Sequence, residues 1–381
     1  MKSFDIKTTI YFGENALDRL AALPAARILV ISDPFVVKSG MIRLLTDRLQ
    51  KAGKEFSVYD DIVPDPPIDK ITAGVRVLLE YDADCIVAVG GGSAIDSAKG
   101  IREVARQMHP ERAVRLIAIP TTSGTGSEVT NFSVISDPEH NTKFPLVADT
   151  LLPQEAILDV ELVKSVPPKV TADTGMDVFT HALESYVSTD NNEFSAALAE
   201  KSIEIFGAFM LRSYLDGNDT HARQKMHVAS CLAGIAFNAT GLGINHSLAH
   251  QLGAQFHIPH GRANAMLLPL VIQYNSGISK HSRSQAEYPK QVKKYCNIAQ
   301  ILGLRNFNTI TTVRSLVSWV EYMMKEMDIP LCISELGVCT REEYFARIPT
   351  MAEAAMLDSC TRTNPKRPEK EDLEKILVEA W

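Results

Sequence analysis

The 381-residue chain lacks several features by which many proteins can be classified at once. It has no run of eighteen apolar residues, so we expect no membrane span. Its first residues, MKSFDIKTTIYFG, carry charges where a signal peptide needs an apolar core. Its six cysteines show no CxxC spacing, which argues against a disulfide framework and a thiolate zinc site. The net charge of -7 argues against a nucleic acid partner. We therefore expect a cytoplasmic protein that contacts neither membranes nor nucleic acid.

What the chain does have is the composition of an ordinary globular protein. Apolar residues make up 45% and charged residues 22% of the chain, values typical of a soluble protein with a large core. At roughly 150 residues per domain, the length predicts two or three domains. The sequence shows no internal repeat or low-complexity segment. The domains must therefore be distinguished by their secondary-structure patterns.

The first part of the chain alternates β-branched segments with helical patterns. Strands are predicted at 27–33, 56–62, 84–90 and 114–120, and helices at 41–53, 68–82 and 94–107. A hairpin is predicted at 130–149 and a last strand at 155–162. This alternation is typical of a doubly wound parallel sheet with helices on both faces.

After residue 175 the strand signals disappear. Helices are predicted at 176–187, 193–215, 222–239, 242–255, 263–275, 286–303, 309–326 and 368–381. The segment 166–175, with two prolines, suits a domain boundary. We therefore expect an α/β domain at 1–170 and an all-α domain at 171–381.

Histidines are concentrated in one short stretch of the helical part. Four of the chain's ten histidines lie within fifteen residues: His246, His250, His257 and His260. The first two are spaced i, i+4 and share one helix face. Pro259 should end that helix and let His260 turn back towards them. Because imidazole is the commonest protein ligand of transition metals, the stretch predicts part of a metal site.

An oxygen ligand is suggested upstream by Asp177 and His181, which are also spaced i, i+4. Alone, such a pair is more often a solvated helix face. Its neighbours Val178, Phe179 and Leu183 are apolar, however, and an unpaired carboxylate there would be costly. Two such pairs from two helices can converge on one ion.

Two loops at predicted strand ends suit a nucleotide. The loop from Gly90 to Ser93 opens a helix that contains Asp96 and Lys99, and its amides suit a phosphate; a tight turn is the alternative. The loop at 120–128 is rich in hydroxyls, namely Thr121, Thr122, Ser123, Thr125 and Ser127, and a polar surface loop is the alternative there. Both loops follow strands of one parallel sheet, so we expect them to face one crevice.

Asp33 closes the first predicted strand. A carboxylate there can accept hydrogen bonds from ribose hydroxyls and would repel the 2′-phosphate of NADP. The segment 34–37 has no Arg or Lys that would favour NADP. The competing interpretation is an N-cap of the next helix. The pattern thus favours NAD.

Taken together, GGGSxxDxxK, PTTSGTGSE, GMDVFTHALE and HSLAHQLGAQFHIPHG resemble, in sequence order, the iron-containing alcohol dehydrogenase family. The resemblance implies a dehydroquinate synthase-like fold, with an N-terminal dinucleotide-binding domain and a C-terminal helical metal-binding domain. It implies that the metal ligands are Asp177, His181, His246 and His260. It places His250 near the metal without coordination, as a proton relay, and excludes His257.

The resemblance also implies cofactor contacts. They fall at Asp33, Gly91, Gly92, Ser93, Thr121, Thr125 and Lys143, to which we add Asp96 and Thr122 from the two loops. Phe132, where relatives often have a smaller or polar residue, and Phe237 are predicted to line the substrate pocket.

The implied activity is hydride transfer between NAD(H) and a short primary alcohol or aldehyde such as 1-propanol or propanal. The expected metal is Fe²⁺, with Zn²⁺ as the alternative. Alternatives within this architecture are ethanol, 1,3-propanediol or lactaldehyde as substrate, a zinc glycerol dehydrogenase, or a phosphate-eliminating cyclase. A non-enzymatic metal or nucleotide sensor is a further alternative. The expected assembly is a homodimer or higher homo-oligomer, with association with a bacterial microcompartment left open.

Overall fold

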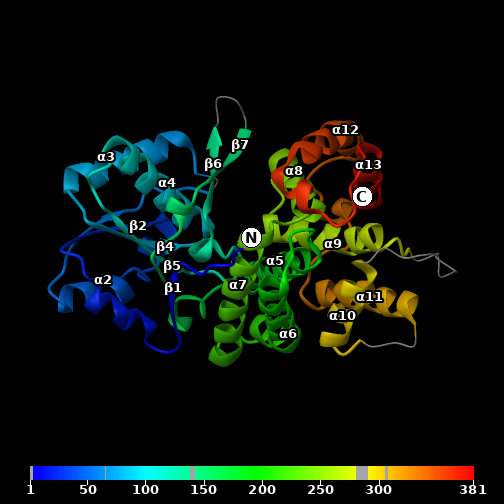
Figure 1. Ribbon diagram of the computed structural model, residues 1–381, viewed down its shortest axis with the longest axis horizontal. Coiled ribbons are helices and arrows are strands. Elements are labelled where there is room, and N and C mark those ends of the chain that lie inside the picture. Colours follow the sequence, from blue (N-terminus) through cyan, green and yellow to red (C-terminus); the bar gives the residue numbers. More distant parts are fainter. Residues whose placement is uncertain (1–2, 65, 138–141, 280–290, 305–307) are drawn as a thin grey trace. The chain divides into compact units, whose positions relative to one another are not determined.

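The computed structural model describes residues 3–64, 66–137, 142–279, 291–304 and 308–381. The chain divides into two compact units, Met1–Ser165 and Val166–Trp381. Figure 1 shows the first as a sheet with helices and the second as helices alone. The expected fold class, α/β followed by all-α, is confirmed. The domain boundary predicted at 170/171 lies inside the first helix of the second unit, α5 (Pro168–Val187).

The N-terminal unit contains a six-stranded sheet in the order β1-β8-β5-β4-β2-β3, with every pair parallel. Its strands are β1 (Thr9–Phe12), β2 (Arg27–Ser32), β3 (Glu55–Tyr59), β4 (Cys85–Gly90), β5 (Arg115–Pro120) and β8 (Glu155–Leu158). Strand β1 was not predicted from the sequence. It is a four-residue edge strand, and its apolar run, residues 10–12, is too short to indicate a strand by pattern alone.

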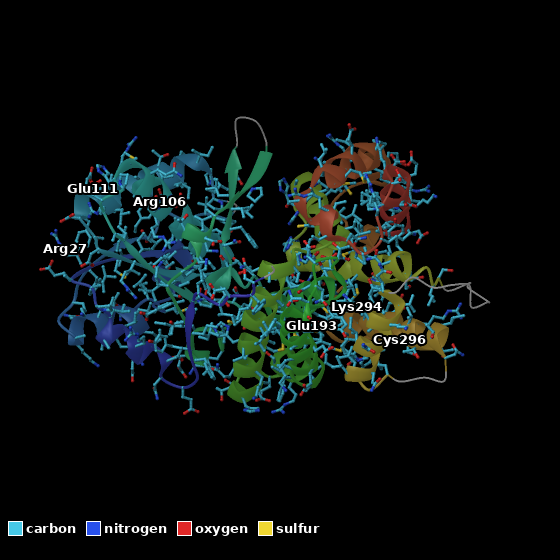
Figure 2. The ribbon with its side chains drawn as sticks, in the orientation of Figure 1. Arg27, Arg106, Glu111, Glu193, Lys294 and Cys296 are labelled. Carbon is cyan, nitrogen blue, oxygen red and sulfur yellow. The ribbon has the colours of Figure 1, made fainter. Side chains whose placement is uncertain are left out.

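Helices cover both faces of this sheet, and the strand residues alternate between them. Leu29 and Ile31 pack into one core with residues of α3 (Ile68–Tyr81) and α4 (Gly92–Met108). Ile28 and Val30 pack into a second core with residues of α2 (Arg43–Lys51). Charged residues such as Arg27, Arg106 and Glu111 lie at the surface (Figure 2). Burial on both faces explains why β2, β4 and β5 read as continuous apolar runs.

The predicted hairpin is present, and the predicted last strand is shorter than expected. β6 (Phe132–Asp137) and β7 (Thr142–Val147) pair antiparallel, with Phe132 opposite Val147. β8 ends at Leu158 instead of 162, because the Asp159 side chain accepts hydrogen bonds from the amides of Glu161 and Leu17 and turns the chain into a 3-10 helix.

The C-terminal unit is helical throughout its described residues. After α5 follow α6 (Glu193–Leu215), α7 (Thr220–Thr240), α8 (Ile244–Phe256), α9 (His260–Ser276), α10 (Gln291–Ile301), α11 (Thr309–Glu326), α12 (Arg341–Leu357) and α13 (Lys370–Glu379). The sequence analysis missed α12, because Pro349 lies inside it, although Thr340 and Glu343 form a capping box at its start. The helix predicted at 286–303 is described from Gln291 onward, and residues 286–290 lie outside the described part.

One large apolar core runs through this unit, with α5 almost wholly buried from Gly175 onward. Helix α5 packs against α6, α7 and α9. Within the described ranges, no single helix is long and apolar enough to cross a membrane; α7 and α8 pass that test only as a pair bent by 106°. The buried position of α5 matters for the site, because its polar residues must find partners inside the protein.

Candidate metal centre and nucleotide-binding edge

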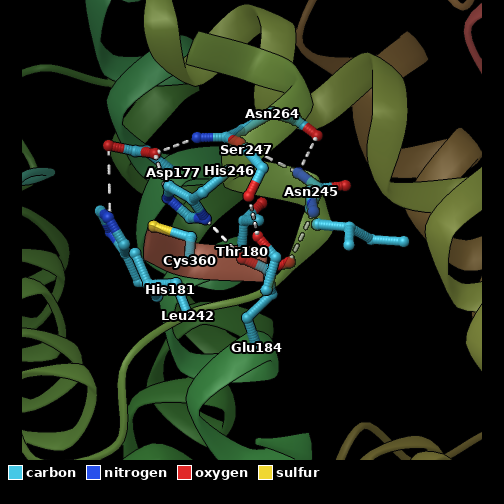
Figure 3. Close-up of polar contacts among 12 residues, drawn as sticks. Asp177, Thr180, His181, Glu184, Leu242, Asn245, His246, Ser247, Asn264 and Cys360 are labelled. Carbon is cyan, nitrogen blue, oxygen red and sulfur yellow. Dashed lines mark hydrogen bonds and ion pairs between the residues drawn. The ribbon is translucent and has the colours of Figure 1, made fainter. Parts of the chain in front are cut away.

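Four side chains of the C-terminal unit bring their ligand atoms within 4.8 Å of one another: Asp177 and His181 of α5, His246 of α8 and His260 of α9. Asp177 Oδ1 lies 3.6 Å from Nε2 of His246 and 3.5 Å from Nε2 of His260. Its other oxygen lies 3.9 Å from Nδ1 of His181. Figure 3 shows one oxygen of Asp177 facing the His181 ring. The structure thus brings together the four residues predicted as metal ligands.

Helix α9 approaches α5 closely enough for this because residue 261 is glycine. A Cβ atom on Gly261 would lie 1.9 Å from the carbonyl oxygen of Asp173, so no other residue fits there without a shift of the backbone. Next to it, Arg262 Nε donates to Asp173 Oδ1 at 2.9 Å in a buried ion pair. These contacts fix the start of α9, and with it His260, beside α5.

His246 has a carboxylate partner behind it. Its Nδ1 lies 2.6 Å from Glu184 Oε2, and both side chains are at least 98% buried. The other Glu184 oxygen accepts the backbone N–H of Asn245 at 2.8 Å. A carboxylate on one imidazole nitrogen directs the second nitrogen at a metal and raises its basicity. Glu184 was not predicted as a site residue, although it follows Asp177 by seven residues and His181 by three on the same helix face.

Asp177 is also held by an amide. Asn264 Nδ2 donates to Asp177 Oδ1 at 2.7 Å, and the Asn264 oxygen accepts from Asn245 Nδ2 at 2.9 Å. That second bond fixes which end of the Asn264 amide faces Asp177. Both asparagines are fully buried. They too were not predicted, because the sequence does not distinguish an asparagine that orients a metal ligand from one that makes an ordinary hydrogen bond in an apolar helix.

The four residues fit a divalent transition metal. Ligand atoms about 2 Å from one ion lie roughly 3 to 3.5 Å apart, close to the separations seen here. His246 Nε2 is buried and has no hydrogen-bond partner among the described residues. Burial lowers the pKa of His246, but the carboxylates of Asp177 and Glu184 beside its two ring nitrogens raise the pKa to about 9. Burial likewise raises the pKa of Asp177, but the three histidines more than offset it. The negative charges of Asp177 and Glu184 therefore favour positive charge at this site, and a bound metal ion would supply it.

The other two histidines of the stretch lie in different places. The His250 ring stacks on that of His260, with centroids 5.4 Å apart, and its Nδ1 lies 2.7 Å from Asp358 Oδ2. His257 is exposed and forms the left-handed C-cap of α8, with φ 54°. The position of His257 therefore does not support it as a metal ligand, although it lies in the histidine-rich stretch. Pro259 separates α8 from α9, as expected.

In the N-terminal unit, the two predicted loops adjoin at the carboxyl ends of neighbouring strands. Gly90, the last residue of β4, pairs with Pro120 of β5, and its carbonyl accepts the amide of Thr121 at 3.0 Å. Gly90 has φ +153°, and a Cβ there would lie 3.0 Å from Asp33 Oδ2, at the end of β2. The strand order reverses between β2 and β4, which is where doubly wound sheets bind ligands.

Asp33 does serve as an N-cap. Its Oδ1 accepts from the amides of Phe35 and Val36 at 2.9 and 3.0 Å, at the start of α1 (Pro34–Lys38). The cap uses one oxygen, while Oδ2 faces Gly90. The capping and nucleotide-binding interpretations are therefore compatible, and the second stays a prediction.

The remaining predicted cofactor residues surround the start of α4. Gly91 is its N-cap, Gly92 and Ser93 are in its first turn, and Thr122 and Thr125 lie against Gly91 and Gly92. Asp96 differs. Its carboxylate accepts from the Ser127 hydroxyl and the Val134 amide, so it holds the hydroxyl loop and β6 against α4. Its direct contact with a cofactor stays a prediction. Lys143 is in β7, opposite Ser136, and its side chain lies outside the described part.

Lys99 is fully buried and fastens the hairpin to α4. Its Nζ donates to Thr130 Oγ1 at 3.0 Å and to the Phe132 carbonyl at 2.8 Å, and lies 3.8 Å from Asp96. Burial lowers its pKa to about 8. The two predicted pocket residues belong to different units: Phe132 begins β6, whereas Phe237 of α7 is buried with its ring 4.4 Å from that of His181.

Comparison with known proteins decides the family. The profile described as "Iron-containing alcohol dehydrogenase" matches residues 7–160, and "Fe-containing alcohol dehydrogenase family, C-terminal" matches residues 171–381. The chain belongs to the iron-containing alcohol dehydrogenase family. Family membership makes it an oxidoreductase acting as an alcohol dehydrogenase, as the sequence motifs predicted.

Individual members of the family are similar over their whole length. The 1-propanol dehydrogenase PduQ of Citrobacter freundii is 42% identical over 381 residues, covering 100% of both chains. The NADPH-dependent butanol dehydrogenase of Clostridium saccharobutylicum is 36% identical, covering 99% of this chain and 97% of its own. The structure of the alcohol dehydrogenase from Oenococcus oeni superposes with a TM-score of 0.90 at 30% identity, covering 100% of both chains. The resemblance drawn from the motifs is thereby confirmed.

Proposed function

We propose that this dehydrogenase transfers a hydride between NAD(H) and a short primary alcohol or aldehyde, with 1-propanol and propanal as preferred substrates and Fe²⁺ as its metal. One observation carries the metal-dependent part: Asp177, His181, His246 and His260 converge, and Glu184 and Asn264 hold two of them from behind. One oxygen and three nitrogens suit a first-row divalent ion and leave room for a substrate oxygen. Zn²⁺ is the alternative metal.

When bound, the ion would act as a Lewis acid on the alcohol oxygen. The protein's part is to fix the ligand geometry and to manage the proton. His250 lies beside the ligand His260 and is not among the four converging residues, so its ring is the group of the site available to accept the hydroxyl proton. Glu184 and Asn264 keep the ligands oriented through buried hydrogen bonds.

We propose that the edge formed by β2, β4 and β5 binds the dinucleotide. The amides at the start of α4 suit the pyrophosphate, and Asp33 Oδ2 suits the ribose hydroxyls. A similar butanol dehydrogenase is NADPH-dependent, so similarity alone does not fix which nucleotide is used. The proposal of NAD rests on the carboxylate of Asp33.

The substrate assignment rests on similarity and on ring volume. The 42% identical relative from Citrobacter freundii is a 1-propanol dehydrogenase. The ring of Phe237 stacks on that of His181, which supports a small pocket at the metal centre, and the role of Phe132 stays a prediction. Ethanol, which is one methylene shorter, and 1,3-propanediol, which has an added hydroxyl, are the nearest alternatives, since a hydrophobic pocket rejects either change by only about 10- to 200-fold.

The test is a substrate panel on protein purified without oxygen. Metal-stripped protein is reloaded with Fe²⁺ or Zn²⁺, and NADH formation is followed with ethanol, 1-propanol, 1-butanol, 1,3-propanediol and glycerol. We expect the highest kcat/KM with 1-propanol, NAD⁺ and Fe²⁺. Equal activity in stripped protein would exclude the metal-dependent mechanism, and better turnover of glycerol with Zn²⁺ would favour a glycerol dehydrogenase instead.

A further inference from the structure

A short segment far downstream in the sequence holds the helix that carries His246 and His250. It comprises Asp358 and the 3-10 helix Ser359–Thr363 with the following Asn364, directly after α12. Thr361 Oγ1 donates to Ser247 Oγ at 2.8 Å, and Thr363 Oγ1 donates to the Leu242 carbonyl at 2.6 Å. The first turn of α8 is thus fastened to a segment more than a hundred residues away in the sequence.

Asp358 makes the contact of this segment with His250. Its Oδ1 accepts the amide of Cys360 at 2.9 Å, as the N-cap of the 3-10 helix, and its Oδ2 lies 2.7 Å from His250 Nδ1. The Asp358 side chain is 15% exposed and that of His250 is 41% exposed. The carboxylate is therefore fixed underneath, while the imidazole ring reaches the surface of the unit.

We propose that Asp358 is a positioning residue that fixes the tautomer of His250, with the proton on Nδ1 and the lone pair on Nε2. The inference rests on the proposed function for its chemical meaning. Because a carboxylate can only accept, the nitrogen facing it must carry the hydrogen, and a neutral imidazole then has its acceptor at the other nitrogen. Burial raises the pKa of Asp358, but the His250 hydrogen bond more than offsets this and holds the pKa at about 2, so the carboxylate is ionised.

The proton balance of the reaction gives this tautomer its role. In alcohol oxidation the O–H bond breaks and its proton passes to His250 Nε2. The carbinol C–H bond breaks, its electron pair leaves as hydride to NAD⁺, and the C–O bond becomes a double bond. If Nδ1 held the lone pair instead, the acceptor would face Asp358 and the outer nitrogen could not take the proton.

The same three side chains could be considered as a second metal site, because His250, Asp358 and Cys360 also bring ligand atoms within 4.8 Å. The contacts argue against it. Both oxygens of the Asp358 carboxylate are already hydrogen-bonded, one to the His250 ring and one to the backbone amide of Cys360.

The decisive variant is Asp358→Asn, which keeps the side-chain size and the N-cap but offers His250 a donor as well as an acceptor. The first readout needs neither metal nor substrate: two-bond ¹H–¹⁵N correlations of histidine-labelled, metal-free protein, with His250 assigned by its loss in His250→Gln. We expect protonated Nδ1 in the wild type and protonated Nε2 in Asp358→Asn. The same tautomer in both proteins would overturn the proposal, even if the proposed function holds.

The second readout is kinetic. We expect Asp358→Asn to lower kcat by roughly 10²-fold, the lower range for a positioned general base, with the KM of the alcohol and the metal content unchanged. In the His250→Gln background the same change should have no further effect, because the residue acts through His250. A further fall in kcat when Asp358→Asn is added to His250→Gln would contradict the proposal. So would the loss of a second bound metal ion in Asp358→Asn, because it would indicate a second metal site at this position.

The matched control is Asp219→Asn, which makes the same change at another N-cap of the unit. Asp219 accepts the Ala222 amide and is ion-paired with Arg212 on the surface. It should leave kcat and the His250 tautomer as in the wild type. A comparable fall in kcat in this control would assign the Asp358 effect to general loosening of the helical unit. If wild-type protein oxidises no alcohol at all, the proposed function fails while the tautomer measurement still stands or falls by itself.

Discussion

The two units prepare their sites in opposite ways. In the candidate metal centre three of the four ligands are buried and His260 is 41% exposed, and each of Asp177, His246 and His250 has a polar partner from a different part of the chain. The nucleotide edge consists of loop backbone at strand ends, with Gly91, Gly92 and Ser93 partly exposed. A transition metal demands fixed donor atoms, whereas a pyrophosphate can be held by the amides that a helix start already offers.

The difference has an energetic consequence. In the helical unit, a lost partner leaves a buried charged or polar group unsatisfied, which costs far more than the hydrogen bond itself contributed. At the sheet edge, water can replace a lost contact. Substitutions in the metal centre should therefore have larger effects than substitutions at the edge, and the following predictions run in that order.

The largest effect is expected when a metal ligand is removed. His246→Ala should lose bound metal and about 10³-fold or more of kcat/KM, because a Lewis acid contributes several kcal/mol to the transition state. A chelator should lower the melting temperature of the wild type but not that of the variant, since only the wild type is stabilised by bound metal. Metal analysis, NADH formation and thermal melts measure the three quantities.

His257→Ala is the matched control, because this histidine lies in the same stretch but is exposed at the C-cap of α8. It should retain metal and activity. The four-ligand centre would have to be abandoned if His257→Ala lost its metal while His246→Ala kept it.

A smaller effect is expected from the partner behind His246. Glu184→Gln keeps an acceptor for the His246 N–H but removes the charge, and should weaken metal affinity by 10- to 100-fold, the usual range for such partners. Competition with a chelator of known affinity measures the change. Glu193→Gln, an exposed position in the first turn of α6, is the control (Figure 2). Equal affinities in both variants would mean that the buried carboxylate does not tune the metal.

How far the sequence could predict each site follows from the same contrast. The i, i+4 pairs and the glycine loop are local patterns, so the sequence could mark the histidine stretch, the Asp177/His181 pair and the two strand-end loops as candidates. The choice of His260 over His250 and His257 as a ligand came from the family resemblance, and the structure brings the four chosen residues together. Glu184, Asn264 and Asp358 were not predicted, because a polar residue with no local signature acquires its meaning only from what packs against it. Gly261 shows this most clearly, since its need for glycine arises from the Asp173 carbonyl, eighty-eight residues upstream.

In the N-terminal unit, Glu128 is a buried charged group whose effect on stability depends on pH. Glu128 is 2% exposed, and burial, opposed by hydrogen bonding and by Lys99, raises its pKa from 4.5 to about 7. Between these two values the folded protein keeps a proton that the unfolded chain has lost, so the free energy of unfolding falls as the pH rises. The full penalty, on the order of 3 kcal/mol, is reached above the folded-state pKa.

Glu128→Gln should remove this dependence. Compared with the wild type, it should be about equally stable near pH 4.5 and more stable by a few kcal/mol at about pH 8, as measured by denaturant unfolding at both pH values. Glu14→Gln, at an exposed position, should change neither. If the free energy of unfolding of Glu128→Gln falls with pH as steeply as that of the wild type, the Glu128 carboxylate is in contact with water in the folded protein.

The smallest effect is expected at Asp33, where the edge contributes a side chain. Asp33→Asn keeps the N-cap of α1, since asparagine caps as well as aspartate, and removes only the charge. A carboxylate and a 2′-phosphate about 4 Å apart near water repel by about 1 kcal/mol or somewhat more, so the preference for NAD over NADP should fall by about tenfold. The ratio of kcat/KM for the two cofactors measures this preference.

Asp33→Ala should shift the ratio equally and, in addition, lose about 1 kcal/mol of stability with the cap. If Asp33→Asn leaves the ratio unchanged while Asp33→Ala still lowers the melting temperature, Asp33 is only a cap, and the N-terminal unit selects its nucleotide by backbone alone.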